Sequence, residues 1–250
     1  MIKEDTSWGG EANWYDELVE GEGSYQKELI LPNLLRLMEI KKGEKILDLG
    51  CGQGFFCRAF HEEGASVTGV DLGDELIEIA KSKSPSVIKF FAGNADDLSS
   101  FSDSSFDKVS IVLALQNMEK ISEVLKEASR VLNPKGKLYL VLNHPAFRIP
   151  KKSSWKTDSK NKIYRRTDEY ISESRTEIEM HPGKVEESKT VSFHHPLQYY
   201  FKNLEKAGFA TTRLEEWVSD KKSQDGHMQA EENRTRKEFP LFLVIVAVKV

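Results

Sequence analysis

The residues best suited to chemistry lie in a glycine-rich turn near position 50. Asp48 ends a short apolar run, and Gly50, Gly52 and Gly54 follow it at alternate positions, before a second apolar stretch. This layout predicts a strand, a tight turn and the start of a helix. Glycine lets backbone approach a ligand closely, and a helix start offers free N–H groups at the positive end of its dipole. The turn therefore predicts a site for a polar ligand.

Two classes of ligand compete for this turn. A dinucleotide-binding fingerprint, G-x-G-x-x-G, requires a third glycine where this chain has Phe55. A carboxylate at Asp48 would also repel the two negative charges of a pyrophosphate. Asp48 suits instead a ligand that carries positive charge, as S-adenosylmethionine (SAM) does on its ammonium and sulfonium groups. The residues of the turn thus favour SAM over a dinucleotide.

Further segments, in order along the chain, resemble motifs of the class I SAM-dependent methyltransferases. The turn resembles their first motif, an acid followed by G-x-G-x-G. The other matching segments are Val70-Asp71, Gly93-Asn94-Ala95-Asp96, Ser105-Phe106-Asp107-Lys108-Val109, Leu115-Gln116-Asn117-Met118 and Arg130 to Leu138. The resemblance covers residues 43–143 and is closest to the small-molecule branch that includes the ubiquinone and menaquinone methyltransferases. Lys135 replaces the first glycine of the last motif.

The resemblance implies SAM as cofactor, S-adenosyl-L-homocysteine as product, and a set of binding residues. Asp71 would accept hydrogen bonds from the ribose hydroxyls, and Asp96 one from the adenine amine, although the adjacent Asp97 could take that role. Tyr15 would contact the cofactor from an N-terminal helix, with core packing as the rival interpretation. The full predicted cofactor set is Asp48, Gly50, Cys51, Gly52, Gly54, Asp71, Leu72, Asn94, Ala95, Asp96, Leu115, Gln116 and Tyr15. The small Cys51 side chain also suits a crowded turn without any ligand.

Strand-like and helix-like segments alternate along most of the chain, which predicts an α/β fold with a mostly parallel sheet. Together with the resemblance, this implies a Rossmann-like, doubly wound, seven-stranded sheet of order 3-2-1-4-5-7-6, its last strand antiparallel. Predicted strands cover 45–49, 66–71, 87–92, 106–115, 137–142, 210–218 and 241–250, and predicted helices cover 55–63, 74–83, 120–132 and 196–207. Residues 220–238 are expected to form a polar loop.

The chain is expected to be one methyltransferase domain over 1–250, with an N-terminal helical lid at 1–40 and an insert at 144–195. The insert is expected to hold a β-hairpin and to cap the substrate site. A methyl acceptor can need a base, and His144 or His194 could supply it, because both lie near the expected carboxyl ends of strands. A histidine that only packs or forms hydrogen bonds is the competing interpretation for each.

Net charge and composition restrict the classes of binding partner that the sequence favours. The net charge of −4 over 250 residues gives no signal for nucleic acid, and Gln116 to Glu119 lacks the motif of enzymes that methylate amines of DNA bases. The two cysteines, the lack of a metal-ligand cluster and the lack of an apolar run long enough for a membrane span favour a reduced, cytoplasmic protein without a metal.

A small-molecule methyl acceptor is the favoured partner. The seven basic residues between Lys151 and Arg166 keep RNA or protein open as acceptor. A non-catalytic SAM-binding protein and a nucleotide-dependent reductase are further alternatives. The sequence leaves monomer and homodimer equally open.

Overall fold

The computed structural model describes residues 19–179 and 189–250. A central seven-stranded sheet has the order β10-β11-β5-β4-β1-β2-β3. Its strands are β1 (Lys45–Leu49), β2 (Ser66–Asp71), β3 (Lys89–Ala92), β4 (Phe106–Val112), β5 (Leu132–Asn143), β10 (Phe209–Trp217) and β11 (Phe242–Lys249). When only the strands of this sheet are numbered along the chain, β10 is strand 6 and β11 is strand 7, so the order is the predicted 3-2-1-4-5-7-6. Only β11 runs antiparallel to its neighbours, so the predicted fold is confirmed.

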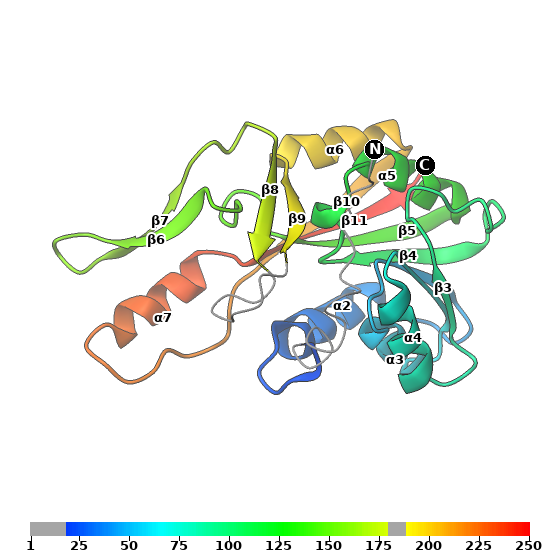
Figure 1. The fold of residues 1–250 in the computed structure, drawn as a ribbon, viewed down its shortest axis with the longest axis horizontal. Helices are drawn as coiled ribbons and strands as arrows, with labels where there is room; N and C mark the ends of the chain where they lie inside the picture. Colours follow the sequence, from blue (N-terminus) through cyan, green and yellow to red (C-terminus); the bar gives the residue numbers. More distant parts are fainter. Residues whose placement is uncertain (1–18, 180–188) are drawn as a thin grey trace.

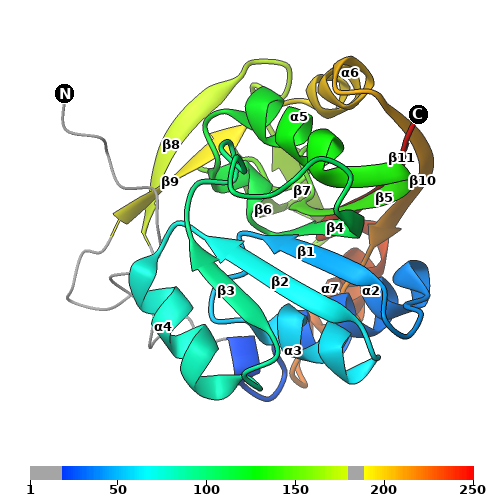
Figure 2. The same cartoon turned by 90° about the vertical axis from the view of Figure 1, so that its right-hand side faces the viewer.

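Helices cover both faces of the sheet (Figure 1 and Figure 2). One face carries α5 (Ile121–Val131) and α6 (Leu197–Lys206), and the other carries α2 (Leu31–Met38), α3 (Phe55–Glu62) and α4 (Asp74–Lys83). The inner face of α5 shows why these segments are helical: Ile121, Val124, Leu125 and Ala128 recur at helical spacing and are all buried. A π-helical turn, η2 (Gln26–Ile30), leads into α2, whose second residue is Pro32, a position that needs no backbone N–H.

The insert holds one more hairpin than predicted. It forms two separate hairpins, β6 (Ser153–Thr157) with β7 (Ile163–Thr167), and β8 (Ser174–Glu179) with β9 (Lys189–His194). The expected hairpin is the second one. The first lies in the basic stretch, whose charges hide the alternation of a strand. Figure 1 shows β6 and β7 projecting away from the sheet, beside α7 (Gln229–Glu238).

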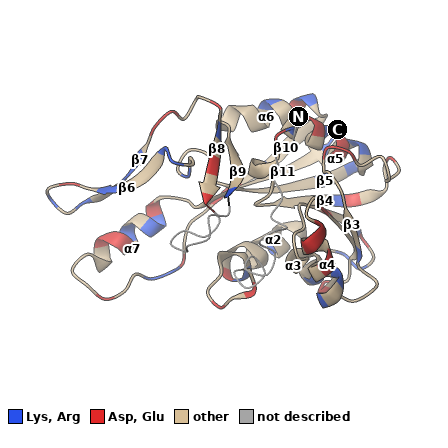
Figure 3. Cartoon of the chain, in the orientation of Figure 1, with Lys and Arg blue, Asp and Glu red and all other residues tan. Residues whose placement is uncertain are grey.

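Helix α7 corrects the predicted loop at 220–238. Its outward surface is so polar that the sequence carries almost no apolar periodicity, and its contacts are polar instead. Glu231 accepts a hydrogen bond from the Ile163 backbone N–H, and Arg234 donates one to the Ile163 carbonyl. Lys and Arg of the β6–β7 hairpin therefore lie beside a helix that carries both signs of charge (Figure 3).

Three strand boundaries differ from the predicted ones by two residues or more. β3 begins at Lys89 rather than 87, and β5 begins at Leu132 rather than 137. β4 ends at Val112 rather than 115, because Leu113 takes a left-handed conformation with φ 53° and turns the chain into the 3₁₀-helix η3 (Leu115–Asn117). Of the predicted N-terminal lid, residues 1–18 lie outside the described part of the chain. No helix within the described ranges combines the length and apolar character needed to cross a bilayer.

Candidate functional site

The glycine turn lies where the order of the sheet reverses. β1 pairs with β2 on one side and with β4 on the other, both in parallel, so the carboxyl ends of three strands meet there. Ligands of open α/β sheets bind at such points. Gly50 has φ 71°, and a Cβ built on it would lie 2.4 Å from Ala114 Cβ. The turn is therefore packed directly against the segment that follows β4, and no side chain can stand at position 50.

A carboxylate ties the turn to the end of β2. The Gly52 backbone N–H donates to Asp71 Oδ2 at 2.8 Å, and the Gly73 N–H donates to Asp71 Oδ1 at 2.9 Å. Burial raises the pKa of Asp71, while these backbone donors act in the opposite direction. Each carboxylate oxygen retains a lone pair, so Asp71 can still accept two hydroxyl groups. The next residue, Leu72, is 43% exposed, an apolar surface beside a hydrogen-bonding one.

Asp48 lies beneath the turn and is 1% exposed. Its Oδ1 accepts a hydrogen bond from Ser110 Oγ at 2.7 Å, and its Oδ2 faces Cys57 Sγ at 3.5 Å. Burial is the main reason that the pKa of Asp48 rises to about 7. Within residues 19–179 and 189–250, neither Asp48 nor Asp71 has a Lys, Arg or His partner in an ion pair. Both acids thus lack a compensating positive charge.

The residues predicted around adenine and after β4 are placed less uniformly. Asn94 is exposed and Ala95 is buried, and Asp96 forms an ion pair with Lys120 at 2.9 Å that the sequence did not predict. Leu115 packs inside the main hydrophobic core, so the structure gives its side chain a packing role. Tyr15 lies outside the described residues. The predicted contacts of the remaining residues with a cofactor stay predictions.

Hydrogen bonds hold both ring nitrogens of His144 and the Nε2 nitrogen of His194. His144 Nε2 lies 2.8 Å from Glu216 Oε1, and its Nδ1 accepts a hydrogen bond from the Ala146 N–H at 3.2 Å. His194 Nε2 lies 2.9 Å from the Tyr170 carbonyl oxygen, to which it donates. Burial lowers the pKa of His144, while Glu216 opposes that effect. These contacts give His144 a structural role on both ring nitrogens, and a catalytic role for either histidine stays a prediction.

Three residues, of which two were not predicted, have buried polar atoms that a ligand could complete. Among the described residues, three buried side-chain atoms have no hydrogen-bond partner: Gln53 Nε2, Gln116 Oε1 and His195 Nε2. An unsatisfied buried polar atom costs about 1–3 kcal/mol, so such atoms gather where a ligand completes them. Gln53 belongs to the glycine turn and Gln116 to η3. Only Gln116 was predicted, through its motif; the other two have no signal beyond their position beside motif residues.

The residues present fit SAM. The turn has no side chain at Gly50 that would block a ligand, and Asp71 can accept the two hydroxyls of a ribose beside an apolar contact at Leu72. Asp48 is a buried carboxylate without a cation, at the end of the strand that leads into the turn. A ligand with a sulfonium and an ammonium group supplies the missing positive charge. Among the described residues there is no group of three side chains that could hold a metal ion.

Comparisons with known proteins agree with this geometry. Residues 47–140 match the family described as "Methyltransferase domain". Demethylmenaquinone methyltransferase of Staphylococcus aureus is 35% identical over 127 residues, which is 49% of this chain and 52% of that protein. Among solved structures, a SAM-dependent methyltransferase from Mesorhizobium loti is 26% identical, with a TM-score of 0.69 over 86% of this chain and 96% of that one. A putative one from Listeria monocytogenes is 25% identical, with a TM-score of 0.71 over 88% and 96%.

Residues 47–140 therefore form a methyltransferase domain, within a chain that has the class I SAM-dependent methyltransferase fold. The predicted resemblance is confirmed. The chain spans about half the length of the curated relatives it matches. The family match ends before His144, so it covers the glycine turn, Asp71 and the segment after β4 but not the insert.

Proposed function

We propose that this protein is a SAM-dependent methyltransferase that transfers a methyl group to an oxygen, nitrogen or carbon atom of a small organic molecule. The observation that carries the proposal is the hydrogen bond from the Gly52 N–H to Asp71. It fixes the glycine turn to the only carboxylate at the end of β2, and so forms the wall that a ribose and a charged amino-acid group would both touch. The matched family and the similar solved structures support the same cofactor.

Each part of this wall has a separate task. Bound SAM supplies a methyl group on a positively charged sulfur, ready for in-line displacement. Asp71 would hold the ribose end, and Asp48 would place negative charge beneath the turn without touching bulk water. The packing of Gly50 against Ala114 fixes the distance between the turn and the segment after β4, where the acceptor must approach. The chain therefore contributes mainly by orientation and by exclusion of water.

A small-molecule acceptor is supported by the contacts of the basic stretch. Lys152 pairs with Glu169 at 2.6 Å, and Arg166 pairs with Asp168 at 2.8 Å. Arg165 donates to the Phe147 carbonyl and to Ser153, and its guanidinium lies 5.0 Å from the centre of the Trp155 ring. These three of the seven cations contact the insert itself, which weakens the support for an RNA acceptor. We further propose that the insert 144–195 forms the acceptor cap, and residues 1–40 the lid.

Calorimetric titration tests the cofactor. SAM and S-adenosyl-L-homocysteine should both bind the protein, and NADH should not. Asp71→Ala removes both acceptors for the ribose hydroxyls, each worth about 1.5–3 kcal/mol, so SAM affinity should fall by about 10²-fold or more. The matched control is Asp103→Ala, an exposed carboxylate at the opposite edge of the sheet that pairs with Arg130. Binding of NADH without SAM contradicts the proposal.

The acceptor is tested separately with a labelled methyl donor. Fractions of cell metabolites and a short-chain demethylmenaquinol are incubated with the protein and labelled SAM. The label should enter a low-molecular-weight product. The demethylmenaquinol is included because of the named relatives, whose match to this chain covers only about half their length. Label that enters only RNA or protein would replace the small-molecule acceptor with the alternative.

A further inference from the structure

His195, beside the predicted His194, combines a carboxylate partner on one ring nitrogen with a buried second nitrogen that has no partner in the described chain. His195 follows β9 directly, and its Nδ1 lies 3.0 Å from Glu173 Oε2. Glu173 precedes β8, and the register Ser174↔His194 places the two residues at the same end of the hairpin. Because the carboxylate accepts, the Nδ1 nitrogen carries the proton and Nε2 keeps its lone pair. Within the described residues, that Nε2 is buried and has no hydrogen-bond partner.

The surroundings of His195 hold the ring in one orientation. Its face stacks on Tyr199 with a centroid distance of 3.9 Å, and the Tyr200 ring meets it edge-on at 6.1 Å. Both tyrosines come from α6. A buried imidazole clamped between a carboxylate and two rings has little freedom to turn its free nitrogen elsewhere. The geometry is that of an oriented base rather than of a surface histidine.

The free nitrogen belongs to the same part of the molecule as the methyltransferase site. β9 packs against η3, the short helix that follows β4 at the carboxyl edge of the sheet. η3 contains Gln116, whose Nε2 donates to the Leu113 carbonyl at 2.7 Å and whose Oε1 has no partner in the described chain. Two segments in contact thus each hold a buried polar atom that lacks a partner. One is an acceptor oxygen and the other is a basic nitrogen.

We propose that His195 is the general base of methyl transfer, that Glu173 is its positioning residue, and that the acceptor carries an ionisable O–H or N–H group. This inference rests on the proposed function. As the acceptor atom forms its bond to the methyl carbon, its proton moves to His195 Nε2. The electron pair of the breaking sulfur–carbon bond stays on sulfur, so charge and atoms balance. Glu173 then stabilises the imidazolium through the proton on Nδ1.

Burial favours the neutral form of the His195 ring before reaction. Burial lowers its pKa, His194 acts in the same direction, and Glu173 opposes both. The other titratable groups that face it are the hydroxyls of Tyr199 and Tyr200, whose pKa values are raised by burial, and η3 presents the uncharged Gln116. Turnover should therefore rise as His195 loses its proton, with a midpoint below pH 6.5, and then stay level toward pH 8.

Nuclear magnetic resonance of the full chain labelled with ¹⁵N-histidine tests the arrangement without any acceptor. Long-range ¹H–¹⁵N correlations at pH 7.5 should show a protonated Nδ1 and an unprotonated Nε2 for His195. Glu173→Gln should lower the pKa of His195 further, because a negative neighbour is lost. This variant should fold, since the Glu173 side chain is 58% exposed. A proton on Nε2 in the wild-type protein overturns the proposal.

Turnover supplies the second readout, with labelled SAM and the metabolite fraction that accepts its methyl group. His195→Gln should lower turnover by about 10²-fold or more, with SAM affinity by calorimetry unchanged. Glu173→Gln should lower it by about tenfold and shift the pH midpoint downward. The control is His61→Gln on α3, which lies outside the insert. Unchanged turnover in His195→Gln, or a larger loss in His144→Gln, overturns the base; failure of wild-type protein to bind SAM overturns the proposed function instead.

Discussion

The two edges of the central sheet handle charge in opposite ways. At the carboxyl edge, Asp48 and Asp71 accept hydrogen bonds only from neutral donors, and burial raises the pKa of both. At the amino edge, Glu44 forms an ion pair with the buried Lys108, and Asp107 accepts hydrogen bonds from the Lys45 N–H and the Asn133 amide. Among the described residues, Asp48 and Asp71 at the carboxyl edge have no cation, whereas the buried Lys108 at the amino edge has a carboxylate partner.

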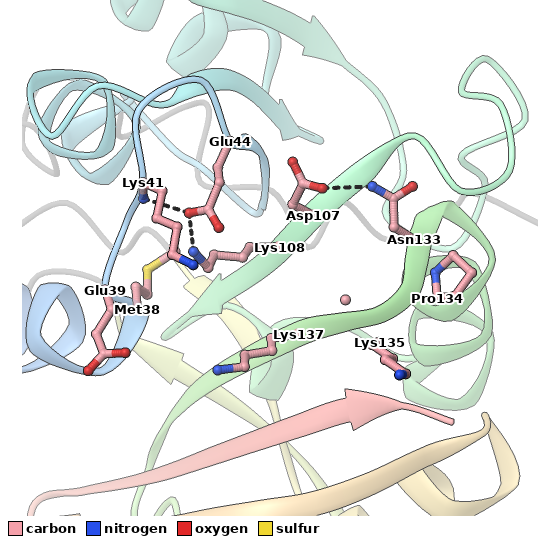
Figure 4. Close-up of a pocket in the computed structure, with 11 residues that line it drawn as sticks. Met38, Glu39, Lys41, Glu44, Asp107, Lys108, Asn133, Pro134, Lys135 and Lys137 are labelled. Atoms are coloured by element: carbon pink, nitrogen blue, oxygen red, sulfur yellow. Dashed lines mark hydrogen bonds and ion pairs between the residues drawn. The ribbon is translucent and has the colours of Figure 1, made fainter.

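The pocket at the amino edge makes the contrast clearer. Figure 4 shows a pocket of about 290 Å³ between the starts of β1, β4 and β5, lined by four lysines and three acids. The dashed lines join these residues to one another: Glu44 to Lys108 and to the Lys41 backbone, and Asp107 to Asn133. Glu44 and Lys108 form an ion pair at this pocket, and none of the predicted site residues lines it.

The comparison indicates that a buried charge without a counter-charge identifies the site better than the presence of a pocket does. A buried carboxylate without a cation raises the free energy of the folded protein unless something else supplies the charge. A cationic ligand at the carboxyl edge would supply it, whereas the amino edge gains nothing from one. Substitutions at matched positions of the two edges should therefore have different consequences.

The largest difference should come from the glycines that flank β1. Gly50→Ala combines a left-handed backbone at φ 71° with a Cβ 2.4 Å from Ala114 Cβ. The backbone costs about 1–2 kcal/mol and the overlap about 1–3 kcal/mol, so we expect a loss of about 3 kcal/mol in the free energy of unfolding. SAM binding should be abolished, because the turn must move. Urea denaturation and calorimetry measure the two effects.

Gly43→Ala is the matched control at the amino edge. Gly43 also has a positive φ, 83°, but nothing lies within 4 Å of a Cβ built there. Only the backbone term of about 1 kcal/mol should remain, and SAM affinity should be unchanged. Equal losses of stability in the two variants would contradict the close approach of the turn to Ala114.

The second prediction concerns the amino edge, which should not bind the ligand. A substitution there should lower stability strongly and leave ligand binding unchanged. Glu44→Gln leaves Lys108, whose side chain is 7% exposed, without its carboxylate. Loss of one partner of a fully buried pair costs about 3–5 kcal/mol, and the partial exposure of Glu44 reduces this to about 2 kcal/mol. The free energy of unfolding should fall by that amount while SAM affinity stays at the wild-type value. A weaker affinity would mean that the two edges are coupled.

The sequence predicted the carboxyl edge better than the insert for a physical reason. In β4, Val109, Ile111 and Val112 are apolar because both faces of the strand are covered, and the glycines at 50, 52 and 54 stand where φ is positive. Because such positions allow few residue types, the pattern of residues predicts the strand and the turn. Leu113 shows where prediction from the sequence fails. Its positive φ ends β4 three residues early, and leucine is not a residue type that indicates a positive φ.

The insert and α7 lack such constraints on residue type. β6, β7 and α7 form one polar assembly through Glu231 and Arg234, whose partners are backbone groups of Ile163. Backbone partners leave no pattern in the residue types of the other strand. For the same reason His195 could not be told from His194 in the sequence, since only the hairpin register and the position of Glu173 distinguish them.

The third prediction concerns pH. A cationic ligand should bind the ionised form of Asp48, whose pKa is about 7 without ligand. Affinity for SAM should therefore fall by about tenfold between pH 8 and pH 6, equivalent to about 1.4 kcal/mol. Asp48→Asn should bind more weakly at pH 8 and lose this component of the pH dependence. Calorimetry across this range, with Asp103→Asn measured alongside, separates Asp48 from titration of the ligand.

Stability should respond to Asp48 with the opposite sign. Because the pKa in the folded protein exceeds the value of 3.8 for an unperturbed Asp, the folded state binds more protons between pH 4 and pH 7. The contribution of Asp48 to stability thus falls as pH rises through this range. Relative to wild type, the ligand-free Asp48→Asn protein should gain stability as the pH is raised. A constant difference across the range would show that the carboxyl group is not perturbed.

The smallest effect should come from exposed apolar side chains at the two edges. Leu72 at the end of β2 is 43% exposed, and Val87 just before β3 is 62% exposed. Neither contributes much to the core, so Leu72→Ala and Val87→Ala should each change the free energy of unfolding by less than about 0.5 kcal/mol. If an adenosine group packs on Leu72, its truncation removes about 1 kcal/mol of buried apolar contact and weakens SAM binding about fivefold. Val87→Ala should leave the affinity unchanged, and equal affinities in the two variants would remove Leu72 from the cofactor site while leaving Asp71 in it.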